Sequence, residues 1–224
     1  MNGKQAAGYR AVEWVEPGMT VGLGTGSTAY WAIQRIGERV KQEGLEIRAI
    51  ATSKASEKLA KELNIPLYEA ADIPHIDLTI DGADEVNPQM DLIKGGGGAL
   101  LREKMVALKS DKLIVVADSS KDVNVLGTFK LPIEVVPFAS EWTLDLLRRR
   151  YEVPMDFRQN EGSIYITDNG NYIIDAAFGR IEETGKLADE LKATTGVVDH
   201  GLFVGIAKTV VLGNEDGTVS VRTK

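Results

Sequence analysis

The first two-thirds of the chain alternate short apolar runs with segments whose apolar residues recur every three or four positions. Strands that alternate with helices in this way are typical of an α/β domain, in which helices cover both faces of a parallel sheet. The apolar runs predict strands at 20–24, 46–52, 65–70, 75–81 and 112–118, and the periodic segments predict helices at 4–15, 25–42, 53–63 and 99–109.

The pattern changes near residue 130. Residues 131–139 contain two prolines, which favours a connection or an edge strand. The segments that follow predict a smaller α+β unit with an antiparallel sheet, and DNGN at 168–171 is a turn signal between two of its strands. They are helices at 140–151 and 181–194, strands at 151–160, 163–169 and 171–179, an apolar segment at 201–205 and a hairpin at 209–223.

Charge and composition narrow the possible functions. The net charge is −7, and RRR at 148–150 is the only basic cluster, so we expect no nucleic-acid partner. No apolar run approaches the roughly 18 residues that span a bilayer, and residues 1–18 lack the apolar core of a signal peptide. We therefore expect no membrane partner and a cytoplasmic location. The chain has no cysteine, and its two histidines, His75 and His200, lie far apart, so we expect no metal site.

Two glycine-rich turns follow predicted strands and precede predicted helices, at 22–28 and 93–99. Backbone N–H groups at a helix N-terminus attract anions, and glycine lets the backbone approach a ligand closely. The first turn also fits the dinucleotide pattern G-x-G-x-x-A, but Thr52, Ser53 and Lys54 occupy the place where that pattern needs an acidic residue. A phosphate site and a tight turn without a ligand remain equally compatible with this turn.

Several charged residues border these turns. Asp81 and Asp84 end a predicted strand, where aspartates also serve as ordinary turn residues. Glu103 lies between Arg102 and Lys104, which suits a solvated helix, although Ala99 and Ala107 share its helix face.

Lys94 and Lys121 could be surface residues. Their position favours a site, because the strand ends near 24, 81 and 118 and the helix start near 98 should meet at one edge of the sheet. Donors and a lysine suit a phosphate, and carboxylates suit proton transfer.

Together these motifs resemble a known family. VGLGTGST, DGADEV, KGGGGALLREK, VVADSSK, TDNGN and GVVDHGLF occur in the same order in ribose-5-phosphate isomerase of the A type, over essentially the whole chain. The resemblance implies an isomerase without a cofactor, which interconverts ribose 5-phosphate and ribulose 5-phosphate in the non-oxidative pentose phosphate pathway. It also implies a Rossmann-like domain over 1–128 and 205–224, a smaller α+β domain over 129–204, and a homodimer or homotetramer.

The resemblance also assigns roles. Glu103 is expected to be the catalytic base, Asp81 to help open the sugar ring, and Lys94 to stabilise substrate oxygens. The expected substrate-binding residues are Lys4, Thr25, Gly26, Ser27, Thr28, Asp81, Gly82, Ala83, Asp84, Lys94, Gly95, Gly96, Gly97 and Lys121.

Two other functions fit a similar sheet. A sugar-phosphate sensor would need a DNA-binding helix-turn-helix, for which the chain has no spare length or basic face. A coenzyme A transferase would use a glutamate as nucleophile and would form a covalent glutamyl thioester.

Overall fold

A computed structural model describes residues 2–224, which divide into two compact units. The first unit contains the chain up to Ala83, Arg102–Asp122 and Ile206–Lys224, and the second contains Asp84–Leu101 and Val123–Gly205. The units differ from the predicted domains at 84–101 and 123–128, which group with the second unit. The reason is local pairing, because two short strands within 84–101 join a strand at Leu202–Phe203.

The first unit is built on a six-stranded sheet with the order β15-β14-β6-β3-β1-β2. Neighbouring strands are parallel except β14 and β15, which form the predicted hairpin. The predicted α/β sheet is therefore confirmed. The strands are β1 (Thr20–Leu23), β2 (Arg48–Ala51), β3 (Ile76–Gly82), β6 (Ser110–Asp118), β14 (Ala207–Gly213) and β15 (Val219–Thr223).

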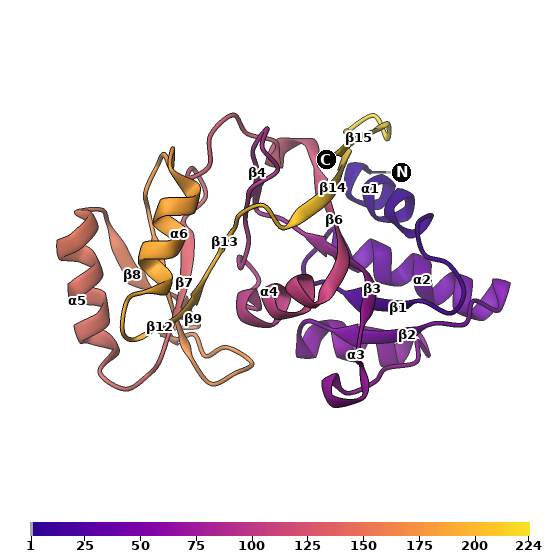
Figure 1. Ribbon diagram of the computed structural model, residues 1–224, viewed down its shortest axis with the longest axis horizontal. Helices are drawn as coiled ribbons and strands as arrows, with labels where there is room; N and C mark the ends of the chain where they lie inside the picture. The colour runs from indigo at the N-terminus through magenta and orange to yellow at the C-terminus, as the bar shows by residue number, and fades with distance from the viewer. Residues whose placement is uncertain (1) are drawn as a thin grey trace. The chain divides into compact units, whose positions relative to one another are not determined.

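Amphipathic helices cover this sheet. In α2 the buried positions Ala29, Ala32, Ile33, Ile36 and Gly37 follow the helical period and form one apolar stripe. Figure 1 shows α1 beside β14 and β15, so that segments from the two ends of the sequence pack together. The helices are α1 (Gly3–Val12), α2 (Ala29–Glu43), α3 (Lys54–Glu62) and α4 (Leu100–Lys109), with short 3-10 turns η1 (Ala70–Asp72) and η2 (Ser119–Lys121).

Three strands of this sheet end at the same edge. Leu23 of β1 lies opposite Ile80 of β3, and Gly82 of β3 lies opposite Val116 of β6. The first glycine-rich turn, the DGAD segment and η2 therefore begin from neighbouring positions, as the sequence predicts for the strand ends at 24, 81 and 118. The turn at 95–98 belongs to the second unit.

The second unit contains a four-stranded antiparallel sheet with the order β12-β7-β11-β8, which confirms the predicted α+β unit. Helices α5 (Ser140–Tyr151) and α6 (Thr184–Lys192) lie beside it (Figure 1). The strands of this unit are β4 (Glu85–Val86), β5 (Leu92–Ile93), β7 (Leu131–Val135), β8 (Met155–Phe157), β9 (Gln159–Asn160), β10 (Ser163–Ile164), β11 (Tyr172–Ala176), β12 (Val197–His200) and β13 (Leu202–Phe203).

Two local predictions were wrong. Strand β7 is a fully buried interior strand and not a connection or edge, because Pro132 is only its second residue and Pro137 lies beyond its end. Residues 65–70 form a single bridge between Leu67 and Ala49 rather than a strand. Among residues 2–224, no helix combines the length and the apolar character needed to cross a membrane.

Candidate active site

The first glycine-rich turn joins β1 to α2 in the first unit. Gly26 has a φ of 107°, a conformation that residues with a side chain rarely adopt. The Thr28 side chain makes no capping hydrogen bond at the start of α2. Lys4 reaches this turn from α1, where its Nζ donates to Ser27 Oγ over 3.0 Å. The turn therefore carries hydroxyl groups, a lysine and a helix N-terminus, which together suit an anion.

Buried hydroxyl groups hold this turn from below. Thr25 Oγ1 lies 2.8 Å from both Thr52 Oγ1 and Ser53 Oγ, and Ser56 Oγ donates to the Gly24 carbonyl over 2.6 Å. Thr52 is fully buried. Thr52 and Ser53 stand where a dinucleotide site needs a carboxylate, and here they stabilise the turn instead. This arrangement disfavours a dinucleotide site.

A cavity of about 690 Å³ opens over the same turn. The turn forms one wall, α2 contributes Tyr30 and Trp31, and α3 contributes Lys58 and Leu59. A concave site of this volume can hold a small molecule. This observation favours a ligand-binding turn over one that only reverses the chain.

Asp81 is fully buried at the end of β3. Its Oδ1 accepts hydrogen bonds from Thr25 N–H over 2.9 Å and from Gly82 N–H over 2.7 Å. Gly24 packs so closely on Asp81 that a Cβ there would lie 2.5 Å from Asp81 Cγ. Asp81 therefore does stabilise the turn, as an ordinary turn residue would, and its carboxylate is held at the sheet edge.

Glu103 lies on the buried face of α4, with only 4% of its surface exposed. Leu100, one turn before it, and Ala107, one turn after it, are also buried. The solvated position that its charged neighbours suggested is therefore wrong. Lys121 lies at the end of η2 and is partly exposed, at the same sheet edge as Asp81.

The second glycine-rich turn lies in the second unit. Gly95 and Gly98 have φ angles of 100° and 80°, and Gly98 N–H donates to the Gly95 carbonyl over 3.0 Å. Asp84 is tied to the turn, because its Oδ2 accepts from Gly96 N–H over 2.7 Å. Gly96 and Gly97 are exposed.

Lys94 precedes this turn with 2% of its surface exposed. Its Nζ lies 5.5 Å from the ring centre of Phe203 on β13, and its backbone N–H donates to the Gly201 carbonyl over 2.8 Å. The prediction of a surface position for Lys94 is therefore wrong. A lysine this deeply buried is unusual in proteins.

The structure thus places the predicted residues in two sets. The first unit brings Asp81 and Gly82 to the first turn and joins Lys4 to Ser27. The second unit brings Asp84 to the turn that follows Lys94. The first set is Lys4, Thr25, Gly26, Ser27, Thr28, Asp81, Gly82, Ala83, Glu103 and Lys121, and the second is Asp84, Lys94, Gly95, Gly96 and Gly97.

Sequence reasoning missed an ion pair beside the second turn. Arg158 forms a two-point salt bridge with Asp175 and also donates to the carbonyls of Gly95 and Gly96. Tyr165 lies against Gly98, and burial raises the pKa of its hydroxyl group. No sequence motif could reveal these contacts. Arg158 and Asp175 meet because β8 and β11 pair in the antiparallel sheet.

The TDNGN motif has a local role in the second unit. Thr167 Oγ1 and Asn171 Nδ2 each donate to Glu134 Oε1 over 2.9 Å, and Asn169 Nδ2 donates to the same oxygen over 3.3 Å. Glu134 is fully buried on β7. The motif therefore fastens a turn to the sheet.

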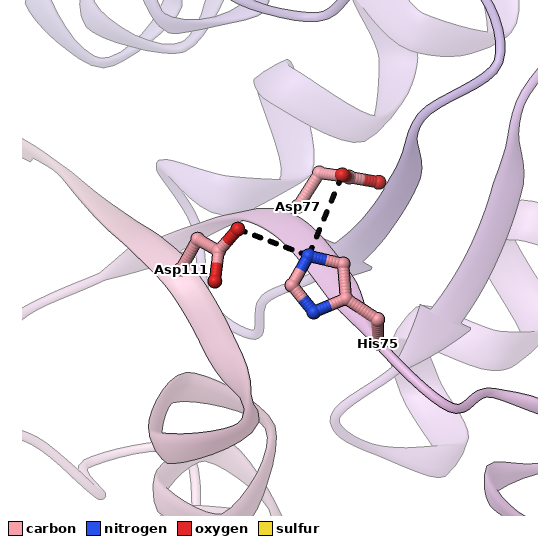
Figure 2. A group of neighbouring side chains, drawn as sticks. All are labelled: His75, Asp77 and Asp111. Carbon is pink, nitrogen blue, oxygen red and sulfur yellow. Dashed lines mark ion pairs between the residues drawn. The ribbon is translucent and has the colours of Figure 1, made fainter.

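One group has the spacing of metal ligands. His75 Nε2 lies 2.9 Å from Asp111 Oδ2 and 3.6 Å from Asp77 Oδ1, and Figure 2 shows the imidazole between the two carboxylates. Asp77 Oδ2 also accepts from Thr20 N–H, and all three side chains are at least partly exposed. Contacts among exposed side chains and a hydrogen bond to the backbone account for this group.

Comparisons with known proteins agree with one another. Residues 48–217 match the family described as ribose 5-phosphate isomerase A (phosphoriboisomerase A). The chain is 50% identical over 214 residues to ribose-5-phosphate isomerase A of Streptococcus agalactiae, and the matched region covers 96% of each chain.

Two solved structures are also similar. Ribose 5-phosphate isomerase from Plasmodium falciparum is 41% identical with a TM-score of 0.95, over 99% of this chain and 97% of that one. A D-ribose-5-phosphate isomerase in complex with phospho-erythronic acid is 36% identical with the same TM-score and the same coverage. The buried carboxylates and the two glycine-rich turns thus lie in a chain that belongs to the ribose 5-phosphate isomerase A family.

Proposed function

We propose that Glu103 is the base that moves a proton between C2 and C1 of the sugar phosphate, through a cis-enediol intermediate. The observation that carries this proposal is the burial of Glu103 one turn into α4, directly after the glycine-rich turn. Because a buried base has little bound water to displace, less solvent must rearrange when it takes a proton from carbon. General acid–base catalysis typically raises the rate about 10²–10⁴-fold.

The negative charge that forms on the sugar oxygen needs donors. Lys94 and the turn Gly95–Gly97 supply them in this proposal, through the N–H groups that Asp84 does not occupy, and each well-aimed donor is worth roughly 10²–10³-fold in rate. Chain connectivity supports a shared role, because Asp84 follows Asp81 by three residues and their Cα atoms cannot be more than about 11 Å apart. Asp81 would assist ring opening, and Asp84 would contact hydroxyl groups.

The phosphate group would bind at the first turn. Thr25, Ser27 and Thr28, with Lys4 and Lys121, would provide donors and positive charge there, beside Gly82 and Ala83, and Gly26 leaves room for close approach. The similar isomerase in complex with phospho-erythronic acid binds a phosphorylated sugar acid, which supports a sugar-phosphate ligand for this chain. We expect the same acid to inhibit this chain in competition with ribose 5-phosphate.

The setting of the reaction follows from its chemistry. Charged sugar phosphates do not cross membranes unaided, so the enzyme must act in the compartment that makes them, which we take to be the cytoplasm. The interconversion is a step of the non-oxidative pentose phosphate pathway. A homodimer or homotetramer is supported by exposed apolar side chains in and just before α5, those of Phe138, Trp142 and Leu146.

An isomerase assay tests the proposal. Wild type should convert ribose 5-phosphate in the presence of EDTA, and Glu103→Gln should lose about 10²–10⁴-fold in kcat while KM stays within a few-fold. Glu141→Gln is the matched control, because Glu141 also lies in the first turn of a helix but is exposed. Near-normal turnover of Glu103→Gln would disprove the assignment.

A solvent-exchange experiment tests the intermediate. An enediol passes the proton through the base, so ribulose 5-phosphate formed in D₂O should carry deuterium at C1. Deuterium at C1 would exclude direct hydride transfer, because a hydride that moves between carbons does not exchange with solvent. Product without deuterium, even at slow turnover, would count against proton exchange through the base.

A further inference from the structure

Arg158 contacts the backbone of the second glycine-rich turn. It follows β8, and its Nη1 donates to the Gly95 carbonyl over 2.9 Å and to the Gly96 carbonyl over 3.1 Å. One guanidinium nitrogen thus holds two consecutive peptide groups of the turn. The side chain is 15% exposed, so little water competes for these bonds.

Asp175 of β11 fixes the guanidinium itself. Its two oxygens accept from Arg158 Nε over 2.9 Å and from Nη2 over 2.6 Å, which is the paired geometry of a strong arginine–carboxylate contact. The backbone of Arg158 is also held, because its N–H donates to Ile173 and its carbonyl accepts from Tyr165. The donor that grips the turn is therefore anchored to the sheet.

Peptide geometry carries this restraint to the other side of the turn. In a planar trans peptide the C=O and N–H bonds point in opposite directions. Holding the Gly95 carbonyl therefore sets the direction of Gly96 N–H, and holding the Gly96 carbonyl sets that of Gly97 N–H. The observed bond from Gly96 N–H to Asp84 Oδ2 agrees with this orientation.

The turn needs such a restraint because of its sequence. Four consecutive glycines have more backbone freedom than any other tetrapeptide, and Gly96 and Gly97 are exposed. A cation on a carbonyl also polarises the same peptide group, which makes its N–H a stronger donor.

We infer that Arg158, oriented by Asp175, is a positioning residue that keeps the Gly96 N–H on Asp84 and thereby aims the Gly97 N–H at the oxygen that becomes negative during isomerisation. This inference rests on the proposed role of the glycine turn. It predicts a loss in the transition state more than in substrate binding, because the charge that the Gly97 N–H meets exists only there.

Steady-state kinetics with ribose 5-phosphate test the inference. Arg158→Ala should lower kcat about 10²-fold with KM within about threefold, and Arg158→Lys and Asp175→Asn should show smaller losses of the same kind. Arg148→Ala is the matched control, because Arg148 also bonds a carbonyl, that of Met155, and an aspartate in the same unit. It should keep the wild-type kcat.

Rescue separates positioning from a general loss of structure. Free guanidinium, at concentrations that leave the fold intact, should restore part of the kcat of Arg158→Ala and none of that of Glu103→Gln. A wild-type kcat in Arg158→Ala, or a KM that rises while kcat is unchanged, would overturn the inference.

A second measurement does not depend on activity. In protein labelled with ¹⁵N-glycine, the amide resonances of Gly96 and Gly97 should shift in Arg158→Ala and stay in place in Arg148→Ala. Unchanged resonances in Arg158→Ala would overturn the inference even if the isomerase assay succeeded. An inactive wild type with shifted resonances would support the restraint and would refute the proposed function alone.

Discussion

Asp81 has a structural role and a proposed chemical role, and two substitutions separate them. Its Oδ1 accepts from Thr25 N–H and Gly82 N–H in a fully buried site. Hydrogen bonds to a charged acceptor contribute about 1.5–3 kcal/mol each, so Asp81→Ala should lower the free energy of unfolding of the first unit by roughly 3–6 kcal/mol.

Asp81→Asn should behave differently. Its amide oxygen can still accept from both N–H groups, and the loss should be roughly 1–3 kcal/mol, the difference between charged and neutral bonds. Turnover should nevertheless fall by about 10²-fold or more, because an amide cannot take up a proton as a carboxylate does.

Urea unfolding followed by tryptophan fluorescence measures the first quantity. Trp142 is 76% exposed in the second unit, so Trp142→Phe in every variant leaves Trp14 and Trp31 to report on the first unit. Equal losses of stability in Asp81→Ala and Asp81→Asn would refute the idea that the two N–H bonds hold the turn. Wild-type turnover in Asp81→Asn would refute the chemical role.

Two further predictions concern packing and pH. Gly24→Ala should lower the melting temperature, because its Cβ would crowd Asp81 at a typical cost of about 1–3 kcal/mol. Gly185→Ala on α6 meets open space and should raise the melting temperature. The opposite order in a thermal melt would count against this packing. Burial raises the pKa of Tyr151, so its contribution to stability is present below its unfolded pKa of about 10 and is lost as pH rises through the folded value. Tyr151→Phe should therefore lose less stability above about pH 10 than wild type does in urea unfolding, and an identical alkaline decline in both proteins would contradict this account.

The sequence predicts the long elements of this fold and misses the short ones. The apolar stripe of α2 repeats from Ala29 to Gly37 in a helix of fifteen residues, so its period is readable. Strands β4 and β5 have two residues each, too few for any period, and only pairing with β13 defines them. The burial of β7 was hidden by Pro132 within the strand and Pro137 beyond its end.

The site shows the same division. The glycine-rich turns and Asp81 are visible in the sequence, because they follow predicted strands. The burial of Glu103 is not, because Arg102 and Lys104 on either side suggest a solvated helix. The bond between Arg158 and Gly95 depends on how β8 and β11 pair, which no local pattern encodes.

The position of β14 has a consequence for synthesis on the ribosome. Strand β6 pairs with β14, yet residues 119–206 must emerge between the two, and the larger segment of the second unit, Val123–Gly205, lies within that interval. Until β14 arrives, the nascent chain presents an unpaired apolar strand edge, Leu113–Ala117, which is the kind of surface that recruits other strands. Pausing or premature release in this window should therefore favour aggregation and chaperone capture over completion of the sheet.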